Sequence, residues 1–240
     1  MSHLKFILPF LFTLLVIDQC NCQTLLGVET GVSWTSLRNP SRGDSYGDIL
    51  NCKSFPSYYF SFEIKGRKSK HIHIGGDLSF FQSYFNLQAT SGGHFPENEN
   101  INYKISTLRI SIFPELTFGK KVQFLLNLSP YFGYIITASK KGTSTNYNGY
   151  PYMNLQTENE TGSATGDFYR FDFGFQETAG VGYLIKTWFM ISVKETGNLG
   201  LLPVNKFLND GFKSENISLL FGVSFIIPEQ KDKETAKPSN

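Results

Sequence analysis

The chain has 240 residues, of which 40% are hydrophobic and 18% are charged, and its formal net charge at pH 7 is +2. These values exclude a disordered polyelectrolyte and a strongly basic nucleic-acid-binding protein. Aromatic residues make up 15% of the chain and there are 22 glycines against three methionines, a mixture that favours β-structure over helix. One large all-β domain fits this length.

The first 22 residues have the pattern of a secretory signal peptide. Residues 6–17 form an apolar run, and Cys20 and Cys22 precede a cleavage site before Gln23. The run is shorter than the roughly 20 residues that a transmembrane helix needs. Acylation of Cys20 or Cys22 as a lipoprotein anchor is the alternative interpretation.

Cleavage at this site leaves Cys52 as the only cysteine, so no intramolecular disulfide can form. No later segment holds 18 consecutive apolar residues, and we therefore expect no membrane-spanning helix. Strands with alternating apolar and polar residues can still cross a bilayer when they close into a barrel, because closure pairs every backbone N–H and C=O group.

About eight segments of the chain show this alternation of apolar and polar residues. The clearest is the last, in which Ile217, Phe221 and Phe225 share one face and Ser218 and Gly222 share the other. In chain order the predicted strands lie within residues 28–34, 58–64, 71–80, 107–118, 123–134, 170–185, 189–194 and 216–227. Glu177 is an exception, because it falls on the apolar face of its strand.

The connections between these strands alternate in length. Short turns are predicted at Lys65–Lys70, Gly119–Lys121 and Lys186–Thr187. Long loops are predicted at residues 38–56, 86–100, 138–167 and 197–214. Short turns at one end and long loops at the other are typical of outer-membrane barrels, whose short turns are periplasmic. We therefore predict a closed antiparallel up-and-down transmembrane β-barrel over residues 23–228, followed by a polar tail, 229–240. The first and last strands of the barrel should both have their outer chain ends at the short-turn end.

Two stretches resemble a known family. Residues 103–136, YKISTLRISIFPELTFGKKVQFLLNLSPYFGYII, are similar to the central part of the PorT-like, Bacteroidetes-type outer-membrane β-barrel domain. Residues 171–185, FDFGFQETAGVGYLI, resemble the next strand of that family. The resemblance implies the same fold and an outer-membrane location, and its better-known member implies a role in a secretion or gliding apparatus.

An eight-stranded barrel has an interior just wide enough for side chains, so we expect a filled lumen without porin activity. The polar faces place charged residues of both signs in that lumen: Glu29, Glu63, Asp77, Arg109, Glu115, Asp172 and Lys194. An unpaired charge there would be costly, and we therefore expect Arg109 to form an ion pair with Glu63, Asp77 or Glu115. A role of Arg109 and Glu115 in transport or gating is the alternative to a structural network.

Other candidate sites have simpler explanations. His71, His73 and Asp77 lie on one strand face with spacing that could suit a metal ion, but they also fit a polar lumen. No Gly-x-Ser-x-Gly motif is present, and His94 lies in a predicted loop without a serine and an acid arranged near it. We expect no catalytic residue, no cofactor and no metal site.

We therefore expect an outer-membrane barrel with a structural role, or a surface-binding role through its long extracellular loops. The expected partners are outer-membrane lipid, the barrel-assembly machinery and an extracellular or secretion-apparatus partner, but no nucleic acid. The terminal pattern Gly222, Phe225, Ile227 resembles the signal by which the barrel-assembly machinery recognises a last strand. A soluble, secreted lipocalin-like carrier of small molecules is the main competitor.

Overall fold

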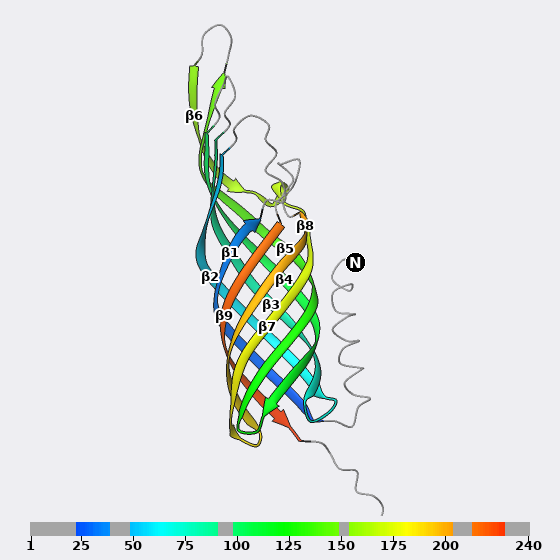
Figure 1. The fold of residues 1–240 in the computed structure, drawn as a ribbon. Coiled ribbons are helices and arrows are strands. Elements are labelled where there is room, and N and C mark those ends of the chain that lie inside the picture. Colours follow the sequence, from blue (N-terminus) through cyan, green and yellow to red (C-terminus); the bar gives the residue numbers. More distant parts are fainter. Residues whose placement is uncertain (1–22, 39–48, 91–97, 149–153, 204–212, 229–240) are drawn as a thin grey trace, which may run out of the picture.

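The computed structural model describes residues 23–38, 49–90, 98–148, 154–203 and 213–228 (Figure 1). The predicted signal peptide, its two cysteines, His94 and the polar tail lie outside these residues. The elements are β1 (Thr24–Arg38), β2 (Ile49–Arg67), β3 (Ile72–Thr90), β4 (Asn98–Gly119), β5 (Val122–Asn148), β6 (Asn154–Ser163), the 3₁₀ helix η1 (Thr165–Asp167), β7 (Phe171–Lys186), β8 (Phe189–Pro203) and β9 (Lys213–Ile227). No helix among the described residues is long and apolar enough to cross a membrane.

Eight of the nine strands close into an antiparallel barrel, as predicted. The sheet order is β4-β3-β2-β1-β9-β8-β7-β5, and the pairing of β4 with β5 closes the ring. The first and last strands pair along their whole length, from Thr24 opposite Ile227 to Arg38 opposite Lys213. The remaining strand, β6, lies outside the ring and pairs, among the described strands, with β5.

Three short turns gather at one end of the barrel, which we call the tight-turn end (Figure 1). They join β2 to β3, β4 to β5, and β7 to β8. At the second turn Gly119 has a φ of 109°, and a Cβ there would lie 2.0 Å from the carbonyl oxygen of Val122, so this position requires glycine. The start of β1 and the end of β9 lie at the same end, which confirms the predicted position of the barrel's two chain ends.

The prediction of long loops at the opposite end is wrong for much of the chain. Residues 49–55, 84–90, 98–104 and 139–148 continue β2, β3, β4 and β5 beyond the ring, and β6 adds a fifth strand. We call these five segments the protruding sheet (Figure 1). Residues 197–203 of the last predicted loop belong to β8, whereas 39–48, 91–97, 149–153 and 204–212 lie outside the described residues.

Where it adjoins the barrel, the inner face of the protruding sheet is apolar, whereas the inner face of the barrel is polar. A buried cluster on this inner face consists of Phe85, Leu87, Ile101, Tyr103, Ile105, Ile135, Ala138, Ala164 and Phe168. The segment around η1 covers the cluster, since the Phe168 ring packs edge-on against Tyr103 with 5.5 Å between centroids. This cluster packs the base of the protruding sheet against the segment around η1.

Two β-bulges mark the level at which the pattern changes. One lies in β2 between Phe55 and Tyr59, and the other lies where Ser106 and Thr107 of β4 face β5. On β5 the bulge leaves Ile136 and Thr137 both exposed, so the inward positions change from odd to even residue numbers. A bulge adds one residue to one strand and so reverses the faces of everything beyond it.

Candidate functional site

The lumen holds every charged residue predicted to lie there. Their side chains are all buried, and Arg109 and Glu115 are each only 1% exposed. The complete predicted set is Glu29, Glu63, Asp77, Arg109, Glu115, Asp172 and Lys194. Lys65 belongs to the same group but was wrongly predicted to lie in a turn, because β2 continues to Arg67.

An ion-pair network fills the lumen toward the tight-turn end. The Lys65 ammonium lies 3.0 Å from the Glu63 carboxylate and 2.9 Å from that of Glu115. The Lys194 ammonium pairs with Glu63 at 2.9 Å and also with Glu29. Two ammonium groups therefore hold three carboxylates, and the five residues come from four strands. Such a network orders the interior, because removing one member leaves its partners buried and unpaired.

Arg109 lies farther along the lumen and has a different partner from those predicted. Its guanidinium carbon lies 3.8 Å from the ring centroid of Tyr131 and 4.4 Å from that of Phe81, and its Nη2 lies 3.5 Å from Asp172. Among the described residues, no ion pair within 4.0 Å joins Arg109 to Glu63, Asp77 or Glu115. The prediction of its partner is therefore wrong, although its position in the lumen is confirmed.

The reason lies in the strand register. Arg109 of β4 faces Gly133 of β5, which in turn faces Asp172 of β7. Because Gly133 has no side chain, the guanidinium can reach across β5 to the carboxylate. Asp77 instead accepts hydrogen bonds from Ser111 Oγ at 2.8 Å and from Gln176 Nε2 at 3.3 Å.

The histidines and Asp77 do not converge on one point. The ring of exposed His71 stacks on Phe118, whereas buried His73 contacts the Thr117 hydroxyl through Nδ1 at 3.0 Å. Asp77 is occupied by the hydrogen bonds just described. In the part of the chain that the structure describes, no three histidine, cysteine or acidic residues are placed to hold a metal ion.

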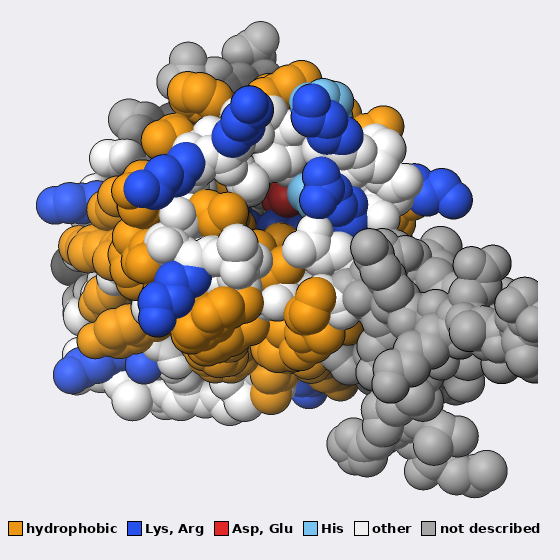
Figure 2. Space-filling model, turned by 90° about the horizontal axis from the view of Figure 1, so that it is seen from below, with side chains coloured by type: hydrophobic (Ala, Val, Ile, Leu, Met, Phe, Trp, Pro, Cys, Tyr) orange, Lys and Arg blue, Asp and Glu red, His pale blue; other side chains and the backbone are white. Residues whose placement is uncertain are grey.

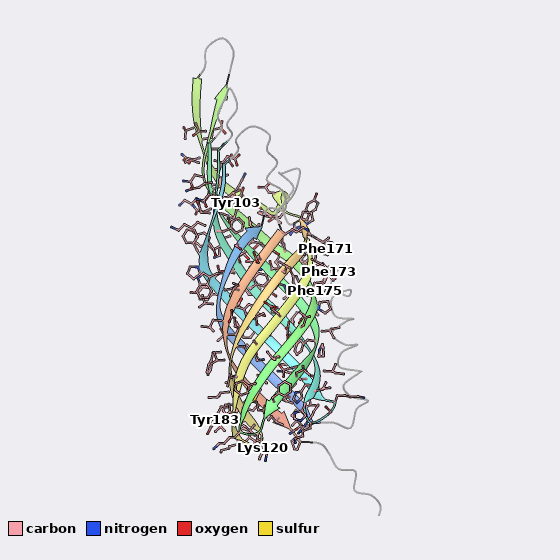
Figure 3. All side chains as sticks on the ribbon, in the orientation of Figure 1. Tyr103, Lys120, Phe171, Phe173, Phe175 and Tyr183 are labelled. Carbon is pink, nitrogen blue, oxygen red and sulfur yellow. The ribbon has the colours of Figure 1, made fainter. Side chains whose placement is uncertain are left out.

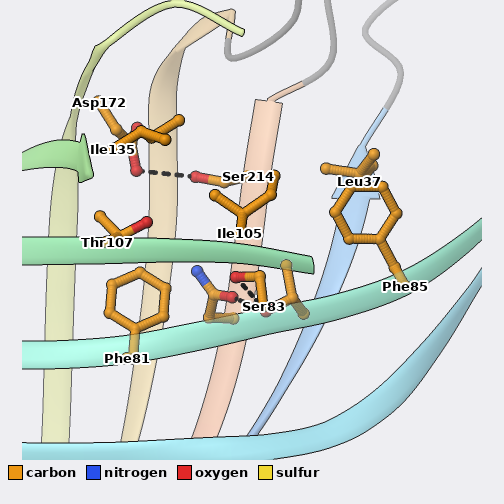
Figure 4. Close-up of a pocket in the computed structure, with 11 residues that line it drawn as sticks. Leu37, Phe81, Ser83, Phe85, Ile105, Thr107, Ile135, Asp172 and Ser214 are labelled. Carbon is orange, nitrogen blue, oxygen red and sulfur yellow. Dashed lines mark hydrogen bonds between the residues drawn. The ribbon is translucent and has the colours of Figure 1, made fainter. Parts of the chain in front are cut away.

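A small cavity lies in the lumen below the protruding sheet (Figure 4). Its volume is about 30 Å³, enough for a few water molecules at most. Ser214 Oγ donates a hydrogen bond to Asp172 across it at 3.0 Å, and Thr35 Oγ1 donates to Ser83 Oγ at 2.9 Å. Both ends of the lumen are thus packed with side chains, in agreement with the expectation of a filled interior.

The outside of the barrel carries the apolar faces. Phe171, Phe173 and Phe175 project outward from the half of β7 farther from the tight turns, and Tyr183 projects outward at the tight-turn end (Figure 3). On β9 the outward residue Phe221 is 51% exposed. An outward apolar band flanked by aromatic residues is the surface that a membrane barrel presents to lipid. The soluble-carrier alternative is wrong, because a soluble barrel buries its apolar faces in a core.

Two carboxylates interrupt this band. Glu177 of β7 projects outward as predicted and faces Gly197 of β8. Glu195, two residues before Gly197 in β8, also projects outward. The Glu177 side chain lies over Gly197, where an added Cβ would meet its Oε1 at 2.9 Å. The predicted strand ends at Lys194, one residue before Glu195, whereas β8 continues to Pro203.

Sequence comparison identifies the family, and structure comparison adds examples of similar architecture. A search of curated proteins found no match. Among solved structures, the attachment invasion locus protein Ail of Yersinia pestis is 12% identical with a TM-score of 0.45, covering 86% of this chain and 99% of its own. Neisserial surface protein A is 11% identical with a TM-score of 0.47, covering 84% of this chain and 96% of its own. Residues 21–201 match the family described as "Outer membrane protein beta-barrel domain". The chain therefore belongs to the outer membrane protein beta-barrel domain family and is an eight-stranded barrel of the cell outer membrane.

Proposed function

We propose that this protein binds an anionic partner at the cell surface through the outer face of its protruding sheet. The observation that carries the proposal is the charge of this face. Lys53, Lys104 and Lys141 all project from it and are exposed. Among the described residues, no carboxylate shares this face.

The strand register shows which residues make up the face. Lys53 of β2 faces Asn86, which faces Asn102, which in turn faces Lys141 of β5. At the next outward-facing pair toward the barrel, Tyr84 faces Lys104. The acidic residues of the protruding sheet, Glu99, Glu158 and Glu160, occupy the alternate, inner register positions.

Uncharged polar groups surround these lysines. The Asn86 amide donates to the side-chain oxygens of Asn100 at 2.7 Å and Asn102 at 3.3 Å. Threonine and asparagine continue the face onto β6, at Thr157, Asn159 and Thr161. Ammonium groups set among amides and hydroxyls suit a partner that has both negative charges and hydrogen-bonding groups, such as an anionic polysaccharide.

Two further features support a binding role for this face. The lumen is filled and its cavity holds only water-sized molecules, so recognition falls to the surface. Beneath the sheet, the Lys140 ammonium lies 3.0 Å from Glu160, and its hydrogen bond to that carboxylate raises the pKa of Lys140. The inner acidic groups are thus partly neutralised and detract less from the positive outer face.

The test uses the mature protein in lipid nanodiscs and two soluble polymers. Dextran sulfate should bind and uncharged dextran should not. The variant K53Q/K104Q/K141Q should lose most of the binding, whereas K120Q/K121Q/K186Q, which removes three cations at the tight-turn end, should keep it. Equal binding of the two polymers, or undiminished binding by the first variant, would contradict the proposal.

Finer assignments rest on the sequence. Residues 103–136 support membership of the PorT-like group and, through it, a partner in a secretion or gliding apparatus. The terminal pattern at Gly222, Phe225 and Ile227, which lies in β9, supports recognition by the barrel-assembly machinery. The absence of a catalytic centre stays a prediction, which assays of lipid and peptide hydrolysis by the purified protein can test.

A further inference from the structure

All three turns at the tight-turn end carry exposed basic residues. We call this set the basic rim, and it consists of Arg67, Lys68, Lys70, Lys120, Lys121 and Lys186. None of them forms an ion pair with a described carboxylate. Viewed from this end, basic side chains surround the mouth of the barrel, and the acidic side chain in view lies inside the mouth (Figure 2).

Aromatic contacts fix the depth of the basic rim relative to the membrane. The Lys121 ammonium lies 5.3 Å from the ring centroid of Tyr183, and the Lys186 ammonium lies 5.3 Å from that of Trp188. Tyr183 and Trp188 are 40% and 48% exposed at the lower edge of the lipid-facing band. Tyrosine and tryptophan in this position lie at the level of the lipid headgroups, and the ammonium groups stacked on them must lie there too.

We propose that the basic rim binds the phosphate groups of anionic phospholipids in the leaflet at the tight-turn end. Six cations that form no ion pair with any residue the structure describes match a layer of phosphates in charge. Lysine presents a compact ammonium that suits such a group, and polybasic segments at a bilayer surface attract anionic lipids.

The geometry favours lipid over a soluble acidic protein. The turns are short, so their cations stay at the edge of the apolar band instead of projecting beyond it. They are also distributed over three separate hairpins around the barrel, and an encircling layer of headgroups can contact all of them at once. A soluble partner would have to approach through the headgroup layer itself.

The test uses Trp188 as a local reporter of lipid composition. The chain has two tryptophans, and Trp34→Phe leaves Trp188 as the only one. This protein is reconstituted in phosphatidylcholine bilayers that contain either brominated phosphatidylglycerol or brominated phosphatidylcholine, whose bromines quench tryptophan. We expect phosphatidylglycerol to be preferred at Trp188 roughly fivefold over its bulk fraction, and the preference to fall in high salt.

Matched variants show whether the basic rim causes the preference. In the same background, K120Q/K121Q/K186Q should abolish it, whereas K53Q/K104Q/K141Q, on the protruding sheet, should leave it intact. Lys186→Gln alone, next to the reporter, should lower it and serves if the triple variant fails to fold. Equal quenching by the two lipids, or a preference that survives loss of the rim lysines, would overturn the proposal. Binding of poly-glutamate to the tight-turn end without any lipid preference would overturn it in favour of an acidic protein segment.

Discussion

Lys65 is the residue whose loss should disturb the lumen most. Its ammonium contacts two buried carboxylates, so Lys65→Met leaves Glu115 without an ammonium partner and Glu63 with only Lys194. We expect the free energy of unfolding to fall by about 3–5 kcal/mol. Urea titration in phosphatidylcholine vesicles, followed by tryptophan fluorescence, measures this change. Lys141→Met, at an exposed site, should change it by less than about 0.5 kcal/mol, and a similarly small effect at Lys65 would contradict the role of the network.

Whereas Lys65 stabilises the barrel, Glu177 and Glu195 should destabilise it, because their carboxylates face hydrocarbon. Each lies near the middle of its strand's lipid-facing stretch. Replacing either with leucine should raise the free energy of unfolding by about 1 kcal/mol, since acidic side chains near the bilayer midplane cost less than basic ones but still destabilise. The same urea titration tests this, with Glu158→Leu on the protruding sheet as the control. If both leucine substitutions lower the free energy of unfolding, these carboxylates make stabilising contacts with groups other than lipid.

At the level of strands, the alternation of residue types was sufficient to predict which face of the barrel the side chains within each predicted strand occupy. Arg109 and Glu115 could be assigned to the lumen because alternation is a local property of each strand. The partner of Arg109 could not, because it depends on the register of three strands and on the missing side chain at Gly133. Neighbouring residues in the sequence contain no such information.

The protruding sheet was mistaken for loops for a related reason. Above the bulges the outer face becomes polar and apolar side chains such as Phe85 and Tyr103 lie on the inner face, so residues 84–90 and 139–148 no longer match a lipid-facing strand. Asparagine, serine and threonine in these segments are also typical of loops. Pairing with neighbouring strands, together with the cluster around Phe85 and Tyr103, keeps them extended.

Strand β9 offers a direct test of lipid exposure. Phe221 lies on its outward face between Val193 of β8 and Thr30 of β1. Phe221→Arg should destabilise the barrel by ~2–4 kcal/mol in a bilayer, because the charge would enter hydrocarbon. Phe221→Leu is the matched control and should cost much less. Equal free energies of unfolding for the two variants in vesicles would indicate that this face does not contact lipid.

For the molecule as a whole, positively charged surfaces lie at both ends, and the orientation in the membrane decides what each can meet. Short turns are periplasmic in outer-membrane barrels, which places the protruding sheet outside the cell and the basic rim at the inner leaflet. Both proposals depend on this orientation.

The native thiol at Cys52 is a weak competitor in labelling experiments, since burial raises its pKa and keeps it protonated near neutral pH.

Labelling of single cysteines on intact cells tests the orientation most directly. In a Cys52→Ala background, Lys141→Cys marks the outer face of the protruding sheet and Lys120→Cys marks the basic rim. A membrane-impermeant maleimide should label the first variant on intact cells and the second only after the outer membrane has been permeabilised. Labelling at position 120 on intact cells, with protection at position 141, would contradict the account.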